Sequence, residues 1–207
     1  MDSVRHKIRL TRVLNLSMVL AVTFGAVSSL PGRLSAQDQE VSGSLPSRRM
    51  ADGKLWTTRN LNLKRGRSYC YDDAEVNCRR YGRLYSWESA RRACESLGDG
   101  WRLPTNDEWR QLGELYGGLL EESQERGKST FKALIMGGSS GFNAVLGGGR
   151  DLDGRYARLD AHGFYWTASE SGATTARLYN FGKGMQALNR HSDGEKQRAF
   201  SVRCVSE

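Results

Sequence analysis

The sequence predicts an α+β domain, on three observations. Apolar residues recur at helical spacing in two segments of the first half, glycine is concentrated in residues 137–149, and short β-rich runs separated by turn residues follow to the end. Helices followed by strands along a chain are typical of α+β folds. We therefore expect two helices packed on a twisted antiparallel sheet, with a long glycine-rich loop region.

The domain is expected to begin with a strand. Residues 37–49 are rich in Ser, Gln and charge and have no apolar period, which predicts a flexible lead-in. Asp52-Gly53 is a turn signal, and Leu55–Thr58 after it holds aromatic and β-branched residues. Leu61 and Leu63 continue an alternation of apolar and polar positions, so this segment favours extended structure.

Two helices follow. Ser86 can cap the first, which ends near Gly98 and has an inward face of Trp87, Ala90, Cys94 and Leu97. The second begins after Thr105, which has capping-box spacing to Glu108. Its apolar face consists of Trp109, Leu112, Leu115 and Leu119. Gly117-Gly118 would weaken its end.

The second half predicts a loop and then a meander. Six of the thirteen residues in 137–149 are glycine, a density that regular elements rarely tolerate. The strands expected after it are residues 163–167, 176–181, 187–191 and 200–205. Gly172, Gly182–Gly184 and Asp193-Gly194 mark the turns between them. The tail is therefore predicted to be an antiparallel β-meander.

The first 36 residues predict a secretory signal peptide. A basic segment from Arg5 to Arg12 precedes the uncharged apolar stretch Val13–Val27, and small residues lead to Ala36. The alternative, a membrane anchor, would need about 20 apolar residues. We expect cleavage after Ala36, with Ser28 as the second choice. Because no cysteine lies near either position, a bacterial lipoprotein is excluded, and the chain is expected to be secreted, periplasmic or on the outer cell surface.

The charge of the chain does not indicate a nucleic-acid partner. The formal net charge is +8, but residues 1–36 hold five Lys/Arg and one acid, so their removal takes away +4 and leaves +4 on 171 residues. A charge of this size favours solubility. We therefore expect no nucleic-acid partner and no membrane span after cleavage.

Four cysteines in an exported chain predict two disulfides, with three possible connectivities. Cys70 and Cys78 flank Asp72-Asp73, a turn-forming stretch that can bring them together. The preferred pairing is therefore Cys70–Cys78, which leaves Cys94 to pair with Cys204. A zinc site is the competing use, but no C-x-x-C pair is present and the histidines are remote.

A series of motifs in the domain resembles a known family. They are residues 50–61 (MADGKLWTTRNL), 68–72 (SYCYD), 81–87 (YGRLYSW), 100–105 (GWRLPT), 163–170 (GFYWTASE) and 201–205 (SVRCV). In this order they resemble the Fibrobacter succinogenes major paralogous domain, found in exported proteins of Fibrobacter and the Bacteroidota, over about residues 50–207. The resemblance implies a C-type-lectin-like fold in which a cysteine on the first helix bonds one in the last strand. It implies no reaction.

The sequence does not favour an enzyme. Gly137–Gly141 fits the G-x-S-x-G pattern with Ser139 as nucleophile, and His162 or His191 could serve as base. That pattern requires a strand before the serine and a helix after it, whereas this serine lies in a glycine-rich stretch. The sulfatase-modifying oxidases of the lectin-like fold need reactive cysteines, and the four cysteines here are assigned to bridges.

Calcium is the cofactor considered, and it is weakly supported. Asp151, Asp153 and Asp160 could supply the oxygen ligands that calcium prefers. The same residues are ordinary turn formers, the EF-hand spacing is absent, and the sugar-binding motifs of calcium-dependent lectins are missing. We therefore predict no metal and no other cofactor.

A ligand-binding face is expected on the meander. Four tryptophans occupy positions whose periodicity or neighbours predict a structural role: Trp56, Trp87, Trp101 and Trp109. The candidate ligand residues are Trp166, Arg177, Tyr179, Asn189, Arg190 and His191. A sheet face of this composition could bind a glycan or protein, and a solvated polar face would look the same.

These observations predict an exported, non-enzymatic, lectin-like binding module that recognises a carbohydrate or a protein at or outside the cell surface. The alternative is a structural subunit of a surface or fimbrial assembly. A hydrolase that uses Ser139 is a third possibility.

Overall fold

The computed structural model describes residues 45–207. The predicted signal peptide and residues 37–44 of the lead-in lie outside the described residues. The strands are β1 (Ser47–Arg49), β2 (Leu55–Thr57), β3 (Ser68–Tyr69), β4 (Leu84–Tyr85), β5 (Gly147–Arg150), β6 (Tyr156–Leu159), β7 (His162–Glu170), β8 (Thr175–Gly182), β9 (Ala187–Glu195) and β10 (Val205–Ser206). The helices are the 3-10 helix η1 (Tyr71–Asp73), α1 (Glu75–Tyr81), α2 (Trp87–Glu95), α3 (Asn106–Leu115) and α4 (Gln124–Leu134).

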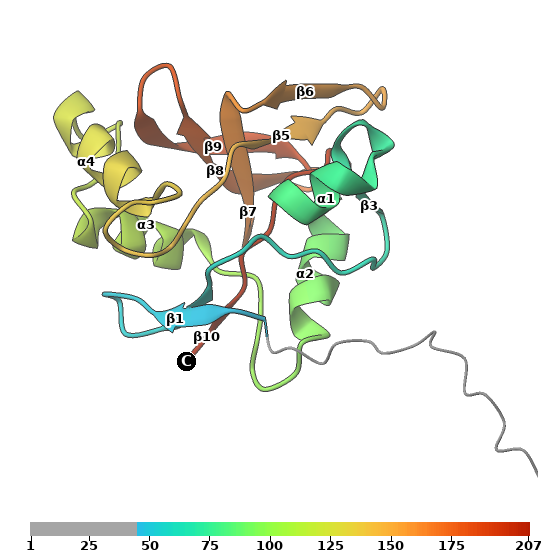
Figure 1. Cartoon of the computed structure of the whole chain (residues 1–207), viewed down its shortest axis with the longest axis horizontal. Helices are drawn as coiled ribbons and strands as arrows, with labels where there is room; N and C mark the ends of the chain where they lie inside the picture. Colours follow the sequence, from blue (N-terminus) through green and yellow to red (C-terminus); the bar gives the residue numbers. More distant parts are fainter. Residues whose placement is uncertain (1–44) are drawn as a thin grey trace, which may run out of the picture. The chain divides into compact units, whose positions relative to one another are not determined.

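The α+β class is confirmed, and the strands of the described part form three sheets. The largest has the order β6-β5-β7-β8-β9, and the smaller two are β1-β2-β10 and β3-β4 (Figure 1). All pairs in the largest sheet are antiparallel except β5 with β7, which is parallel. The sheet is therefore mixed, which corrects the prediction of an antiparallel sheet, whereas β7, β8 and β9 form an antiparallel meander as predicted.

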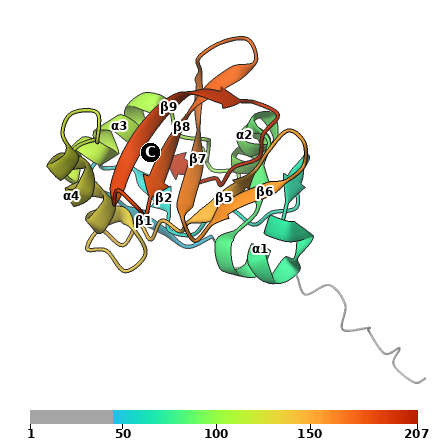
Figure 2. The ribbon, with the colours of Figure 1, turned by 90° about the horizontal axis from the view of Figure 1, so that it is seen from above.

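The helices lie at different sides of the largest sheet. α3 and α4 lie beside β8 and β9, whereas α1 lies close to β5 and β6 (Figure 2). α3 contacts β7 and β8, and α4 contacts β9. One face of β7–β9 is thus covered by α3 and α4, which leaves the opposite face for other segments.

The aromatic core explains the four tryptophans. Trp109 lies at the centre of one cluster, where its ring stacks on Tyr179 at 5.4 Å and meets Trp56 edge-on at 5.2 Å. Trp87 belongs to a second cluster around the Cys94–Cys204 bridge, and the half-buried Trp101 packs against it. Offset and edge-to-face contacts of this kind stabilise cores beyond the burial of area.

The prediction of only two helices was wrong. α2 and α3 lie where the periodicity places them, and Thr105 and Glu108 form the expected capping box. The sequence analysis missed α1, which has seven mostly polar residues, and α4, whose apolar positions are too few for a clear period. α3 ends before Gly117, so Leu115 is exposed and Leu119 is buried by the segment that follows the helix.

The glycine-rich segment ends in a strand, which corrects its assignment as a loop. Gly148 has a φ of +64°, and a Cβ there would lie 2.5 Å from the carbonyl oxygen of Ala157 on β6. A Cβ on Gly149 would lie 2.8 Å from the ring of Phe200. The glycines of β5 therefore permit close approach of neighbouring chain segments, which is a packing reason that composition alone does not reveal.

Two strand predictions near the ends of the domain also need correction. Ser47–Arg49, assigned to the flexible lead-in, forms β1 and pairs with β2. Residues 200–205 do not extend the meander, because only Val205–Ser206 form a strand and that strand pairs with β2. The preceding residues make single bridges, Phe200 to Tyr85 and Ser201 to Tyr165, as the chain passes between the sheets.

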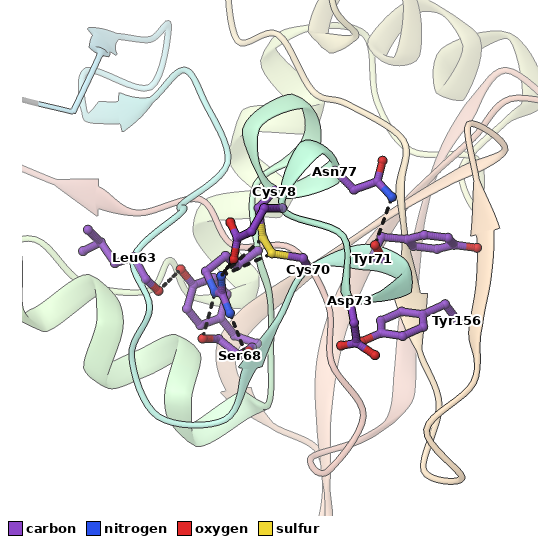
Figure 3. The surroundings of a disulfide bond; sticks show 11 residues. Leu63, Ser68, Cys70, Tyr71, Asp73, Asn77, Cys78 and Tyr156 are labelled. Carbon is purple, nitrogen blue, oxygen red and sulfur yellow. Dashed lines mark hydrogen bonds and ion pairs between the residues drawn. A yellow bond between two sulfur atoms is a disulfide. The ribbon is translucent and has the colours of Figure 1, made fainter.

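Both predicted disulfides are present. Cys70 bonds Cys78, and Cys94 on α2 bonds Cys204 directly before β10. Figure 3 shows the first bridge, where the buried Arg83 donates from Nη1 to both sulfurs at 3.3 and 3.4 Å and from Nη2 to the Ser68 carbonyl at 2.9 Å. The loop that the first bridge closes is thus also held by an arginine.

A buried guanidinium joins three segments. Arg203 is fully buried, and its Nε donates to Asn60 Oδ1 at 2.7 Å. Its Nη atoms donate to the carbonyl oxygens of Thr57 (2.8 Å), Phe142 (2.6 Å) and Asn143 (2.6 Å). Burial lowers the pKa of Arg203. These four neutral acceptors engage four of the five N–H donors of the guanidinium without a carboxylate.

A carboxylate cluster anchors the start of α3. Glu108 accepts from Arg102 Nη1 and Nη2 at 2.8 and 2.6 Å and from the Thr105 backbone N–H at 2.8 Å. Burial alone would raise the pKa of Glu108, but the hydrogen bonds from Arg102 and Thr105 outweigh it and lower the pKa to about 2. The ionised form is therefore the one that the fold stabilises.

We expect loss of the long-range bridge to destabilise the domain more than loss of the short one. In the chain-entropy model, a bridge across 110 residues restricts the unfolded chain by about 4.7 kcal/mol and one across 8 residues by about 2.5 kcal/mol. Thermal unfolding of the Cys94→Ser/Cys204→Ser protein should thus occur at a lower temperature than that of the Cys70→Ser/Cys78→Ser protein. Equal melting temperatures would contradict this ranking.

Arg203→Lys should lower the free energy of unfolding by about 3 kcal/mol, because an ammonium cannot reproduce the planar fork and buried acceptors lose their donors. Urea unfolding measures this value. Arg177→Lys on β8 is the control, because Arg177 forms no ion pair within residues 45–207, and it should change stability by no more than about 0.5 kcal/mol. Similar effects for the two variants would refute the structural role of Arg203.

The domain should lose stability in acid through Glu108. Because the folded pKa of about 2 lies below the ordinary value of 4.5, the stabilisation is complete above about pH 4.5 and is lost as the pH falls toward 2. Glu108→Gln should cost about 2 kcal/mol at pH 7 and less at pH 3. Unfolding at both pH values tests this, with the exposed Asp107→Asn as control. A cost independent of pH would show that the charge of Glu108 is unimportant.

Candidate functional site

The pleat of β8 and β9 divides the predicted ligand residues between two faces. In the register of these strands Tyr179 pairs with Arg190, whereas Asn180 pairs with Asn189 and Leu178 with His191. Paired residues share a face and successive residues alternate. Asn189 and His191 therefore lie on one face, and Tyr179 and Arg190 lie on the other.

The face with Tyr179 is covered by helices. Tyr179 is fully buried and its hydroxyl donates to the Asn106 carbonyl on α3 at 3.1 Å, while burial raises its pKa. Arg190 forms an ion pair with Glu121 at 2.9 Å. The burial of Tyr179 contradicts its predicted role as an accessible ligand residue, whereas Arg190 lies partly exposed on the same face.

Two further predicted residues lie outside an accessible site. Trp166 is fully buried, and its Nε1 donates to the Tyr85 carbonyl at 2.8 Å. Arg177 is partly exposed next to a bulge in β8 and does not line the cavity that contains Asn189 and His191. Of the six predicted residues, the structure brings only Asn189 and His191 together in a cavity.

That cavity lies on the face of the sheet opposite the one that α3 covers, and has a volume of about 420 Å³. Its apolar lining comes from β7, β8 and the segment before β10, namely Phe164, Leu178 and Phe200. Its polar lining consists of Asp151, Arg158, His162, Asn180, Asn189, His191, Asp193 and Arg198. We call this cavity the sheet cavity. Its size falls in the range of small-molecule sites.

A histidine and an aromatic ring define one wall of the sheet cavity. His162 Nδ1 lies 3.1 Å from Asn180 Oδ1, so the amide fixes the imidazole. The imidazole also stacks on Phe164, with 5.5 Å between ring centroids and 6° between planes. Phe164 in turn packs against Phe200 at 5.1 Å. The wall is therefore preorganised by contacts within the protein.

The charges of the sheet cavity compensate one another. Arg198 Nε lies 3.2 Å from Asp151 Oδ1, and His191 Nδ1 lies 3.9 Å from Asp193 Oδ1. Arg158 adds a second cation to the lining. Two arginines and two aspartates thus face the same space, which gives the cavity strong hydrogen-bonding groups without a strong net charge.

Two buried polar atoms of residues that line the sheet cavity make no hydrogen bond within residues 45–207, Arg198 Nε and His191 Nε2. Arg198 Nε lies at ion-pair distance from Asp151, whereas His191 Nε2 has no partner in this part of the chain. Buried polar atoms of this kind usually bond to water or a ligand. This atom marks the place where a bound molecule would gain a hydrogen bond that the protein does not supply.

The three calcium candidates do not come together. Asp151 pairs with Arg198, Asp153 forms an ion pair with Arg155 at 2.7 Å, and Asp160 accepts from Tyr81 Oη at 2.8 Å. Within residues 45–207 the cluster with metal-ligand spacing is Cys70, Glu75 and Cys78, whose sulfurs form a disulfide. The aspartates therefore act as partners of neighbouring side chains.

The local structure around Ser139 differs from a hydrolase elbow. Ser139 lies exposed in a turn that follows α4, so a helix precedes it, and the next element along the chain is β5. An elbow requires the reverse order, a strand before the serine and a helix after it. His162 and His191 instead belong to the sheet cavity.

Most residues that line the sheet cavity are not among those predicted from the sequence to bind a ligand. Phe164, Asn180 and Arg198 had no role in that prediction, although alternation along strands 163–167 and 176–181 could have placed Phe164 and Asn180 on one face. Arg198 and Phe200 could not have been found this way, because they reach the cavity from an irregular segment.

Comparisons with known proteins place the chain in a family. Within residues 45–207 no helix has both the length and the apolar character that crossing a membrane requires. Searches of the curated proteins and of the solved structures return no match. The model of the Fibrobacter succinogenes major domain matches residues 45–206. The chain therefore belongs to the Fibrobacter succinogenes major domain family, as its motifs predict.

Proposed function

We propose that this protein is an exported, non-enzymatic recognition module that binds a carbohydrate in the sheet cavity. The observation that carries the proposal is the unpartnered Nε2 of His191, a residue of a cavity whose lining also holds two asparagine amides and two phenylalanine rings. A sugar presents hydroxyls on its rim and C–H groups on its faces. The cavity offers matching groups for both.

The polar groups suit hydroxyl recognition. The amides of Asn180 and Asn189 each offer donors and an acceptor, and a neutral imidazole adds one donor and one acceptor. Phe164 and Phe200 offer apolar surface to a sugar ring. Because the charges of the cavity compensate one another, a neutral polar ligand is favoured over an ion.

Binding without turnover is supported by the lining. Of the carboxylates and imidazoles that line the sheet cavity, Asp151 is paired with Arg198, and His162 Nδ1 lies 3.1 Å from Asn180 Oδ1. We further propose that the fold is C-type-lectin-like. The bridge from Cys94 on α2 to Cys204 beside the last strand supports this relation.

The proposal predicts opposite results for neighbouring residues on β9. Asn189→Ala and His191→Ala should each weaken binding of a neutral glycan at least about tenfold, because each removes hydrogen bonds to the ligand. Arg190→Ala, on the other face of the same strand, should leave affinity unchanged. A glycan array with the purified protein identifies the ligand, and calorimetry measures the affinities.

Three outcomes would overturn the proposal. The first is equal loss of affinity in Arg190→Ala and Asn189→Ala. The second is that no glycan on the array binds, while a protein is captured by the wild-type chain and not by His191→Ala. This result would make the cavity a protein-binding site. The third is a purified chain that forms ordered polymers in sedimentation, which would favour the structural subunit.

A further inference from the structure

A second concave surface lies away from the sheet cavity and shares no lining residue with it. It runs between the segment after β2, the end of α1 and the turn that follows α4, with a volume of about 410 Å³. We call it the arginine groove. Its charged lining consists of Arg59, Arg79, Arg80 and Arg203.

The charge of the arginine groove is uncompensated. The lining contains four arginines and no Asp or Glu. None of the four forms an ion pair with a carboxylate within the described part of the chain. Asp160, which accepts from the hydroxyl of the lining residue Tyr81, is not within ion-pair distance of Arg79 or Arg80. This contrasts with the sheet cavity, where each arginine shares the space with an acid.

The buried Arg203 strengthens this field. Its hydrogen bonds to Asn60 and to three backbone carbonyls engage four of its five donors, but neutral acceptors do not cancel its charge. A charge in a low-dielectric interior is poorly screened, so its potential extends into the adjoining concave surface. The exposed guanidinium groups of Arg59, Arg79 and Arg80 then offer fork-shaped donors for an oxyanion.

The other residues that line the arginine groove favour one class of polyanion over another. Single-stranded nucleic acids are bound through aromatic faces on which bases stack. The one aromatic residue of the lining, Tyr81, is buried, and Arg80 lies 4.9 Å above its ring. The groove offers small apolar contacts from Leu45, Pro46, Met136 and Val145 and amides from Asn62 and Asn143. Such a surface fits a sugar ring that carries a negative group.

We propose that the arginine groove is a second binding site, which takes the carboxylated or sulfated sugars of an acidic polysaccharide. Arg79 and Arg80 at the end of α1 bind the oxyanion together with Arg59, while Arg203 contributes potential from below. This site is independent of the sheet cavity, so either proposal can fail alone.

Calorimetry on the purified protein with both disulfides intact tests the site. The probes are oligogalacturonate, its methyl ester, dextran sulfate and dextran. Oligogalacturonate or dextran sulfate should bind with an affinity that falls as salt rises, and the matched uncharged probe should not bind. The carboxylated and sulfated probes distinguish the two sources of charge.

Variants locate the binding. Arg79→Gln/Arg80→Gln should weaken binding at least about tenfold, because two charge-assisted contacts are lost. Arg65→Gln/Lys132→Gln removes the same charge from two exposed positions outside the groove and should leave the affinity within about twofold. Asn189→Ala should have no effect. Far-ultraviolet circular dichroism and melting temperature confirm that each variant is folded.

Four results would refute the site. They are equal losses in the two double variants, equal binding of oligogalacturonate and its methyl ester, no binding of either acidic probe, and tighter binding of oligo-dT with the same dependence on Arg79 and Arg80. The last result would assign the groove to nucleic acid.

Discussion

The hydrogen bonds of one buried guanidinium hold together parts of the chain that lie far apart in sequence. Arg203 binds Asn60 and Thr57 from the segment around β2 and the carbonyls of Phe142 and Asn143 from the glycine-rich stretch. The next residue, Cys204, is bonded to Cys94 on α2. Two successive residues thus fix the N-terminal strand, the long loop and a helix to one point. Because a buried cation without hydrogen-bond partners is costly, these bonds favour one arrangement of the three segments.

This constraint also shapes the sheet cavity. The segment that leads to Arg203 cannot join the meander as a fourth strand, since it must cross to the smaller sheet, where Val205 pairs with Trp56. On the way it bridges Arg150 through Ala199 and Tyr165 through Ser201. Phe200 and Arg198 are therefore brought over the open face of β7 and β8, where they complete a cavity that the sheet alone would not enclose.

The elements that were predicted correctly are those whose sequence signals lie within a few neighbouring residues. The period of Trp87, Ala90 and Cys94, the capping box at Thr105 and the turn between Cys70 and Cys78 each lie within a few residues, and each is found in the structure. α4 was missed because its apolar positions are too few for a clear period, and β5 was missed because the reason for its glycines is the close approach of distant residues, as of Phe200 to Gly149. The residues of the sheet cavity were only partly predicted because composition ignores the pleat, which places Tyr179 and Arg190 on one face of the sheet and His191 on the other, beside the cavity.

The two concave surfaces differ in a way that follows from this architecture. In the sheet cavity, side chains from several strands meet and their charges can pair, as Arg198 does with Asp151. The arginine groove lies over Arg203, whose acceptors are carbonyls and an amide that leave its charge intact. Arg203 thus contributes both to the stability of the domain and to the electrostatic potential at the groove. The exposed Arg59, Arg79 and Arg80 contribute charge but do not stabilise the fold. Ligand contacts at the groove can therefore change at these three positions while the buried cation that orders the domain is retained.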